Sequence, residues 1–150
     1  MTTNSAAVRV GRLLEIRANA GYRTDAEVDA LFDVIDVELA KLPASRTVVT
    51  VADWRRLPIM SGSAAGRVLH RIGLLNDRTE RSAALATTKA PSAVLQFMRL
   101  IREAGLPDRQ MFFEPGPLVE WVKEVLTPPE THRLRTFLAE NAPQAASKKE

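Results

Sequence analysis

The sequence predicts a single α/β domain: a mixed sheet with a parallel centre, flanked by helices, plus an extra C-terminal helix. Short apolar runs alternate along the chain with segments of helical periodicity, which is typical of βαβ units. One run, Thr47–Ala52, is unbroken and mostly β-branched, as in strands that are covered on both faces. The length of 150 residues and the apolar content of 45% suit one globular core.

The N-terminal part predicts extended structure followed by a helix. Val8–Ala18 is typical of a hairpin or of one bulged strand, with Gly11 at the irregular position. Thr24 and Glu27 have the spacing of a capping box, in which each side chain accepts a hydrogen bond from the other residue's amide. Apolar residues follow at helical spacing: Val28, Leu31, Phe32, Ile35 and Leu39. We expect this helix to end by Pro43.

The middle of the chain alternates between helices and strands. We expect helices that begin near Ser61, at Pro91 and at Pro115 or Pro117, and strands at Ser82–Thr87 and Gln110–Phe113. The helix from Pro91 is expected to end at Gly105, since glycine is the preferred residue after a helix. Its periodicity points Val94, Phe97, Met98 and Ile101 inward.

The C-terminal part predicts an appended helix. Thr127 and Glu130 form a second capping box, and the helix behind them extends to about Glu140 with the apolar face Leu134, Phe137 and Leu138. We therefore divide the chain into a domain at 1–126, an appended helix at 127–140 and an Ala/Ser/Lys-rich tail at 141–150 that we expect to be disordered. A helix of about 13 residues gains its stability from packing, so its apolar face docks on its own domain or on a second copy.

Composition excludes several classes of chemistry. The chain has no cysteine, which excludes disulfides, thiolate metal sites and a cysteine nucleophile. Its two histidines, His70 and His132, are too few for most imidazole catalysis or zinc binding. The sequence contains no nucleotide-binding glycine motif, zinc-protease motif, nucleophile elbow or calcium-binding loop. We therefore expect a protein that is not an enzyme and needs no metal or cofactor.

Charge is segregated along the chain. The segment Thr24–Ala40 contains six acids and no base, whereas Arg46–Arg81 contains seven arginines against three acids. Complementary fields of this kind favour protein partners or self-association. Together with the apolar face of the last helix, they predict a homodimer. Nucleic acid is not expected as a partner, because the net charge is only +3 and aromatic residues make up 5% of the chain.

No targeting segment is visible in the sequence. Residues 1–7 are polar and lack the basic and apolar regions of a signal peptide. No run of 18 apolar residues occurs, so we expect no membrane span. These features predict a cytoplasmic protein.

The candidate partner-binding surface follows the run Thr47–Ala52. Asp53 ends that strand, where open α/β sheets place functional side chains, although it could equally cap the following loop. Large apolar side chains then alternate with arginines, a mixture that interface cores favour. The alternative is that these apolar side chains fold inward over the sheet edge. The surface comprises Asp53, Trp54, Arg55, Arg56, Leu57, Met60, Ser61, Arg67 and Arg71.

Ser63 is a candidate phosphosite. It lies where a loop enters a helix, and the amides and dipole of a helix N-terminus favour an anion. Arg67 lies one helical turn further on. The alternative is that this serine pair supplies an ordinary helix cap.

The element order and one local match resemble a STAS domain, the fold of anti-sigma-factor antagonists and of sulfate-transporter cytoplasmic domains. The resemblance covers residues 6–126. Asp53 matches a strand-terminal Asp of the family, and the turn Ser61–Ala65 matches its D-S-S-G-L motif, with Ser63 on the phosphorylatable serine. Ser61, Gly62 and Ala64 differ from the motif. The resemblance implies a divergent bacterial regulatory module that binds another protein, such as a regulator or a kinase-like partner, and is switched by phosphorylation.

Two other functions remain open. The segment Phe113–Trp121 resembles the strand-to-helix ending of STAS-like proteins that are similar to the CRAL-TRIO lipid-transfer fold. That resemblance implies a carrier of a small apolar ligand or lipid, which needs an enclosed cavity of several hundred Å³. The other alternative is an enzyme that uses Asp53 and Ser63.

Overall fold

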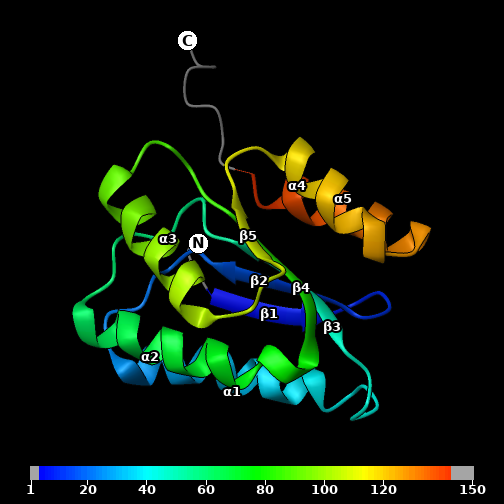
Figure 1. Ribbon diagram of the computed structural model, residues 1–150, viewed down its shortest axis with the longest axis horizontal. Coiled ribbons are helices and arrows are strands. Elements are labelled where there is room, and N and C mark those ends of the chain that lie inside the picture. The colour runs from blue at the N-terminus through cyan, green and yellow to red at the C-terminus, as the bar shows by residue number, and fades with distance from the viewer. Residues whose placement is uncertain (1–3, 143–150) are drawn as a thin grey trace.

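The computed structural model describes residues 4–142 and shows a five-stranded sheet between two layers of helices (Figure 1). The strands lie side by side in chain order. They are β1 (Asn4–Val8), β2 (Leu13–Ala18), β3 (Val48–Asp53), β4 (Thr79–Leu85) and β5 (Arg109–Phe112). Only β1 is antiparallel to its neighbour. The predicted fold class, a mixed sheet with a parallel centre, is confirmed.

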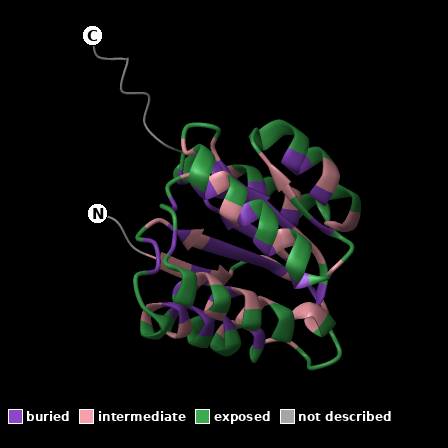
Figure 2. Ribbon diagram, turned by 60° about the vertical axis from the view of Figure 1, so that its left-hand side comes forward, coloured by how far each residue is buried: buried purple, intermediate pink, exposed green. Residues whose placement is uncertain are grey.

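The helices divide between the two faces of the sheet. One face carries α1 (Asp25–Leu39), α2 (Gly62–Leu74) and α3 (Pro91–Ala104), and the other carries α4 (Pro115–Val122) and α5 (Pro128–Glu140) (Figure 1). Short 3-10 turns follow α2 and α4, at Asn76–Arg78 and Lys123–Val125. Buried residues gather on the sheet and on the helix surfaces that face it (Figure 2).

The central strand β3 explains the apolar run in the sequence. Val48 and Ala52 belong to the core under α1–α3, whereas Val49 and Val51 belong to the core under α4 and α5. Successive side chains of a strand point to opposite faces, so a strand that is covered on both sides must be apolar throughout. Thr50 is the one polar residue between the apolar residues of this strand, and its side chain lines an interior cavity that is described below.

The N-terminal segment forms the hairpin of β1 and β2. Gly11 adopts a positive φ of +58° at its turn, and a Cβ there would collide with the carboxylate of Glu130. That buried carboxylate accepts hydrogen bonds from the amides of Arg12 and Thr127, each at 2.8 Å. Burial alone would raise the pKa of Glu130, but these hydrogen bonds outweigh it and keep the pKa below its usual range. One carboxylate thus caps α5 and ties it to the hairpin.

The C-terminal helix belongs to the domain. Leu134, Phe137 and Leu138 are buried in the core against the sheet. The homodimer prediction relied in part on this apolar face. Because the face packs within the chain, it no longer supports a dimer, and dimerisation stays a prediction. The expectation of disorder from residue 141 is wrong at Asn141, which is buried and donates a hydrogen bond from its side-chain amide to Asp53. Residues 143–150 of the expected tail lie outside the described part of the chain.

Other local expectations differ in detail. The capping box is complete at Thr127, but at Thr24 the Glu27 carboxylate accepts from the amide of Arg23 instead. The prediction that Met98 points inward is wrong, since 49% of it is exposed. The apolar stripe of α3 is narrower than the sequence pattern, and it is centred on Phe97 and Leu100.

Candidate functional site

Asp53 is a structural residue at the carboxyl end of β3. Its buried carboxylate accepts hydrogen bonds from the amide of Arg55 at 3.1 Å, from the Arg55 guanidinium at 2.6 Å and from Asn141 Nδ2 at 2.8 Å. Arg55 also donates to the carbonyl oxygen of Leu138. No cluster that could hold a metal ion occurs among residues 4–142. Asp53 therefore caps the loop and connects it to the end of α5.

The predicted apolar contact surface on this loop is wrong. Trp54, Leu57 and Met60 are only 7%, 4% and 5% exposed. The Trp54 ring packs against Phe97 of α3 with 5.0 Å between ring centroids. These side chains close the space between the carboxyl ends of the strands and the covering helices, so a partner cannot reach them without opening the core.

The segment Ile59–Ser63, called the turn below, leads into the start of α2 and is exposed except at Met60. Ile59 is 58% exposed, and Ser61 and Ser63 are also exposed. The turn is fixed by Gln96 of α3, whose side-chain amide accepts from the amide of Met60 at 2.8 Å and donates to the Met60 carbonyl at 2.9 Å. Buried Met60 and this double hydrogen bond hold the exposed turn in one position.

Ser61 and Ser63 have different roles at the start of α2. Ser61 is the N-cap, and its hydroxyl accepts from the amide of Ala64. Ser63 is the second residue of the helix, within its first turn, and its hydroxyl donates to a carboxylate oxygen of Asp25 at 2.7 Å. A phosphate on Ser63 would lose this hydrogen bond and face the Asp25 carboxylate at close range. The serine is accessible, and its modification would act on the contact between α1 and α2.

The arginines of α2 do not form a free basic surface. Arg67 pairs with Asp29 of α1 at 2.8 Å, and Arg71 contacts Asp29, Asp33 and Asp36 at 2.9 to 3.2 Å. Hydrogen bonds from Arg67 lower the pKa of Asp29, and the same contacts raise the pKa of Arg67. The acidic and basic segments of the sequence thus neutralise each other between two neighbouring helices. This corrects the expectation that Arg67 and Arg71 await a partner.

A groove runs between α2 and α3, directly beside the turn. Its volume is about 250 Å³. Gly62, Ala65 and Gly66 line it from α2, and Gln96 and Arg99 line it from α3. A Cβ added to Gly62 or Gly66 would meet no atom within 4 Å. The two glycines are not required by packing inside the domain, and their effect is to keep the groove open.

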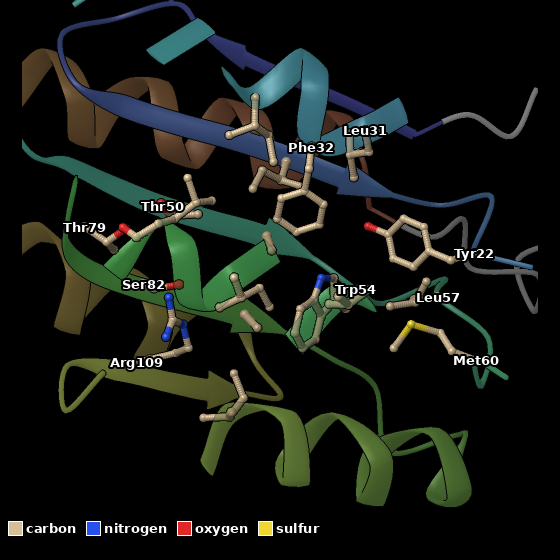
Figure 3. Close-up of a pocket in the computed structure, with 18 residues that line it drawn as sticks. Tyr22, Leu31, Phe32, Thr50, Trp54, Leu57, Met60, Thr79, Ser82 and Arg109 are labelled. Carbon is tan, nitrogen blue, oxygen red and sulfur yellow. The ribbon is translucent and has the colours of Figure 1, made fainter. Parts of the chain in front are cut away.

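An interior cavity lies between the sheet and helices α1–α3 (Figure 3). Its volume is about 50 Å³, several-fold below what a lipid needs. The lining is apolar near Phe32 and Trp54 and polar near Ser82 and Arg109. Sequence reasoning missed the polar residues, because only the strand register reveals that they are neighbours.

The sequence also predicts that the chain has no membrane span. Within residues 4–142, no helix has the length and apolar character needed to cross a membrane.

Comparison with known proteins identifies the fold. No family model and no curated protein matches the sequence. The structure is similar to that of an uncharacterized protein of the DUF3478 family from Shewanella loihica PV-4, which has a SpoIIAA-like fold. The TM-score is 0.58, the sequence identity is 16%, and the match covers 81% of this chain and 97% of the other. This chain therefore has a SpoIIAA-like fold, the fold of STAS domains.

Proposed function

We propose that this chain is a non-enzymatic regulatory module of the cytoplasm that binds another protein through its turn–groove face. This face comprises the turn Ile59–Ser63, whose side chains are exposed apart from buried Met60, and the groove between α2 and α3 that starts at Gly62. The observation that carries the proposal is the groove itself. Two glycines of α2 line it, and no atom of the domain occupies the space where their side chains would be, so the groove is open to a partner.

The rigidity of the turn supports the proposal. Binding loses free energy to the ordering of mobile loops and side chains, so a surface that is already fixed binds more tightly. Gln96 and buried Met60 fix the turn, and Ile59 projects from it with 58% of its surface exposed. An exposed aliphatic side chain beside an open groove is suited to a partner that inserts one apolar side chain and covers another.

Charge and polarity on the face suit a protein partner. Arg99 and Glu103 line the groove and form an ion pair at 2.7 Å on the exposed side of α3. Exposed Arg56 extends the basic side of the loop and donates to the carbonyl oxygen of Ala142. A polar rim around a small apolar centre is the usual anatomy of a protein–protein interface.

Ser63 gives this face a means of control. Phosphorylation adds a charge of about −1.5 to −2 at neutral pH. The added charge would lie beside Asp25, which now accepts the serine hydroxyl at 2.7 Å. Repulsion between the two would displace the first turn of α2, and with it one wall of the groove. In this proposal, phosphorylation weakens partner binding.

The proposal is tested with Gly66→Leu, a substitution that fills the groove. Replacing an exposed helical glycine with leucine raises helix propensity by up to about 1 kcal/mol, so the fold is retained. The matched control is Gly73→Leu on the same helix, where an added Cβ also meets nothing within 4 Å. Gly73 does not line the groove.

The measurement is affinity capture from an extract of the native cell, quantified by mass spectrometry. We expect at least one protein that the unchanged chain and Gly73→Leu retain equally and that Gly66→Leu loses. Circular dichroism melts check that both variants are folded. A set of captured proteins that does not differ between the two variants would contradict the proposal.

A further inference from the structure

Three polar side chains form a row across the sheet face under α1–α3, which is mostly apolar although Thr79 also lies on it. The strand register places Thr50 of β3 opposite Ser82 of β4, and Ser82 opposite Arg109 of β5. All three line the interior cavity, where the Arg109 guanidinium points toward Ser82 (Figure 3). Thr50 and Ser82 keep some accessible surface although they lie in inner strands of the sheet. The hydroxyls of Thr50 and Ser82 at the polar end of the cavity are therefore within reach of a molecule at least as large as water.

Arg109 has a positive charge without a counterion. It is 8% exposed, and among the described residues the only hydrogen-bond partner of its guanidinium is Asn76 Oδ1 at 3.0 Å. Other half-buried arginines of the chain, such as Arg55 and Arg133, are paired with carboxylates. Desolvation lowers the pKa of Arg109 to about 10, so the side chain is still a cation at neutral pH. Buried charges in proteins are normally paired, which makes this one an exception.

The opposite end of the cavity is mostly apolar, and the hydroxyl of Tyr22 is a polar group there (Figure 3). Phe32 of α1, Trp54 and Met60 line it, and Figure 3 shows them well apart from the Ser82–Arg109 end. The volume of about 50 Å³ compares with about 10–15 Å³ that one water molecule needs on the same measure. A ligand in this space has a charged head and only a few heavy atoms behind it.

We propose that this cavity binds a small aliphatic monocarboxylate, of the size of acetate or propionate, whose carboxylate pairs with Arg109. The guanidinium presents a planar fork of donors that matches the two oxygens of a carboxylate. The hydroxyls of Thr50 and Ser82 are further donors from the same side. The short hydrocarbon chain then lies toward Phe32 and Trp54.

The observations favour this ligand class over others. A neutral apolar molecule would leave the guanidinium unpaired in a dry site, which is unfavourable. A phosphate dianion needs more than one positive charge, and Arg109 is the single cation among the lining residues. A fatty acid has a longer chain than the cavity can hold. The single positive charge of Arg109 and the small apolar space beside it favour a carboxylic acid with a short hydrocarbon chain.

The experiment is a titration of the ¹⁵N-labelled full chain with propionate, followed by NMR. We expect saturable shifts at Ser82 and Arg109, and binding weaker by about tenfold or more for propionamide, which is the uncharged analogue of similar shape. Octanoate is expected to bind more weakly than propionate. Equal affinity for propionate and propionamide, or the absence of saturable shifts, would overturn the proposal. So would tighter binding of octanoate, or displacement of propionate by inorganic phosphate at equal concentration.

Variants separate this site from the rest of the molecule. Arg109→Gln should weaken propionate binding by about tenfold or more. The control Gln110→Ala, at the next and exposed position of β5, should not. If Arg109→Gln does not fold, Ser82→Ala and Thr50→Val test the same row of side chains. Unchanged affinity for propionate in both variants would then contradict the proposed site. Gly66→Leu should bind propionate normally, so failure here and failure of the turn–groove proposal are distinguishable.

Discussion

The two ends of the sheet hold their charged side chains in opposite ways. At the carboxyl end of β3, Asp53 is fully buried and its carboxylate accepts from Arg55 and Asn141. On the other face, Arg109 at the start of β5 is almost as buried but pairs with no carboxylate among residues 4–142. We call a charged side chain saturated when groups of its own chain provide its counterion and hydrogen bonds. A saturated side chain stabilises the fold, whereas an unsaturated one keeps the capacity to bind a ligand. A charged residue at a strand end is thus a candidate ligand site only when its partners within the chain are incomplete.

The largest expected effect comes from breaking the saturated end. Asp53→Ala leaves the Arg55 guanidinium buried without its counterion, and such a loss costs about 3–5 kcal/mol of the free energy of unfolding. Urea denaturation monitored by circular dichroism measures it. The control Asp77→Ala removes an exposed carboxylate and should change stability by less than about 0.5 kcal/mol. A cost for Asp53→Ala as small as that of the control would show that the Asp53 network does not stabilise the fold.

A smaller effect is expected at the unsaturated end. Arg109→Met removes a buried charge that has no counterion, and it loses one hydrogen bond to Asn76. The desolvation relief and the lost hydrogen bond oppose each other, so stability should change by about 1 kcal/mol or less in either direction. The same denaturation measurement decides the comparison. A loss comparable to that of Asp53→Ala would mean that Arg109 is a structural residue like Asp53.

The smallest effect concerns the ion pairs between α1 and α2, which are partly exposed. Arg67 holds the pKa of Asp29 below its ordinary value. A carboxyl whose pKa is lower in the folded than in the unfolded chain stabilises the fold above the unfolded pKa, which is about 4. That contribution disappears as the pH falls through the folded pKa. The Asp29→Asn variant should therefore lose less stability than the unchanged chain between pH 5 and pH 3, about the range in which this carboxyl titrates.

Thermal melts at a series of pH values in low salt measure this difference. High salt should reduce it, because exposed pairs are screened. Asp77→Asn serves as the control, since its exposed carboxylate has no ion-pair partner among the described residues. Identical pH profiles for Asp29→Asn and the unchanged chain would show that the pairs do not contribute.

Element positions were predictable because their signals are local. Thr127 caps α5 through an amide three residues away, and Pro91 and Gly105 mark the two ends of α3. The unbroken run that became β3 indicated a strand covered on both faces, which in turn indicated the parallel sheet. Hydrogen bonds and side-chain contacts within one or two helical turns determine such features, and a sequence displays them directly.

The candidate site was only partly predictable for the opposite reason. The loop after Asp53 has no periodicity, so nothing local indicates that Trp54 folds inward while Ile59 stays exposed. The anchor of the turn, Gln96, is 36 residues from Met60, which it holds. Arg67 and Arg71 find their acids 35 to 42 residues earlier, on α1. Each of these outcomes depends on which helices become neighbours.

The sequence by itself determined the helices and strands, most of their end signals and the fold class, because those follow from propensity and spacing along the chain. The tertiary structure alone decided which charges are satisfied. Arg55 reaches across 83 residues to Leu138, and Asn141 reaches across 88 to Asp53, so that end of the sheet is closed. Arg109 meets Ser82 and Thr50 only through the register of three strands. Neutralisation of a charge requires a partner in space, and proximity in space is a property of the packed fold.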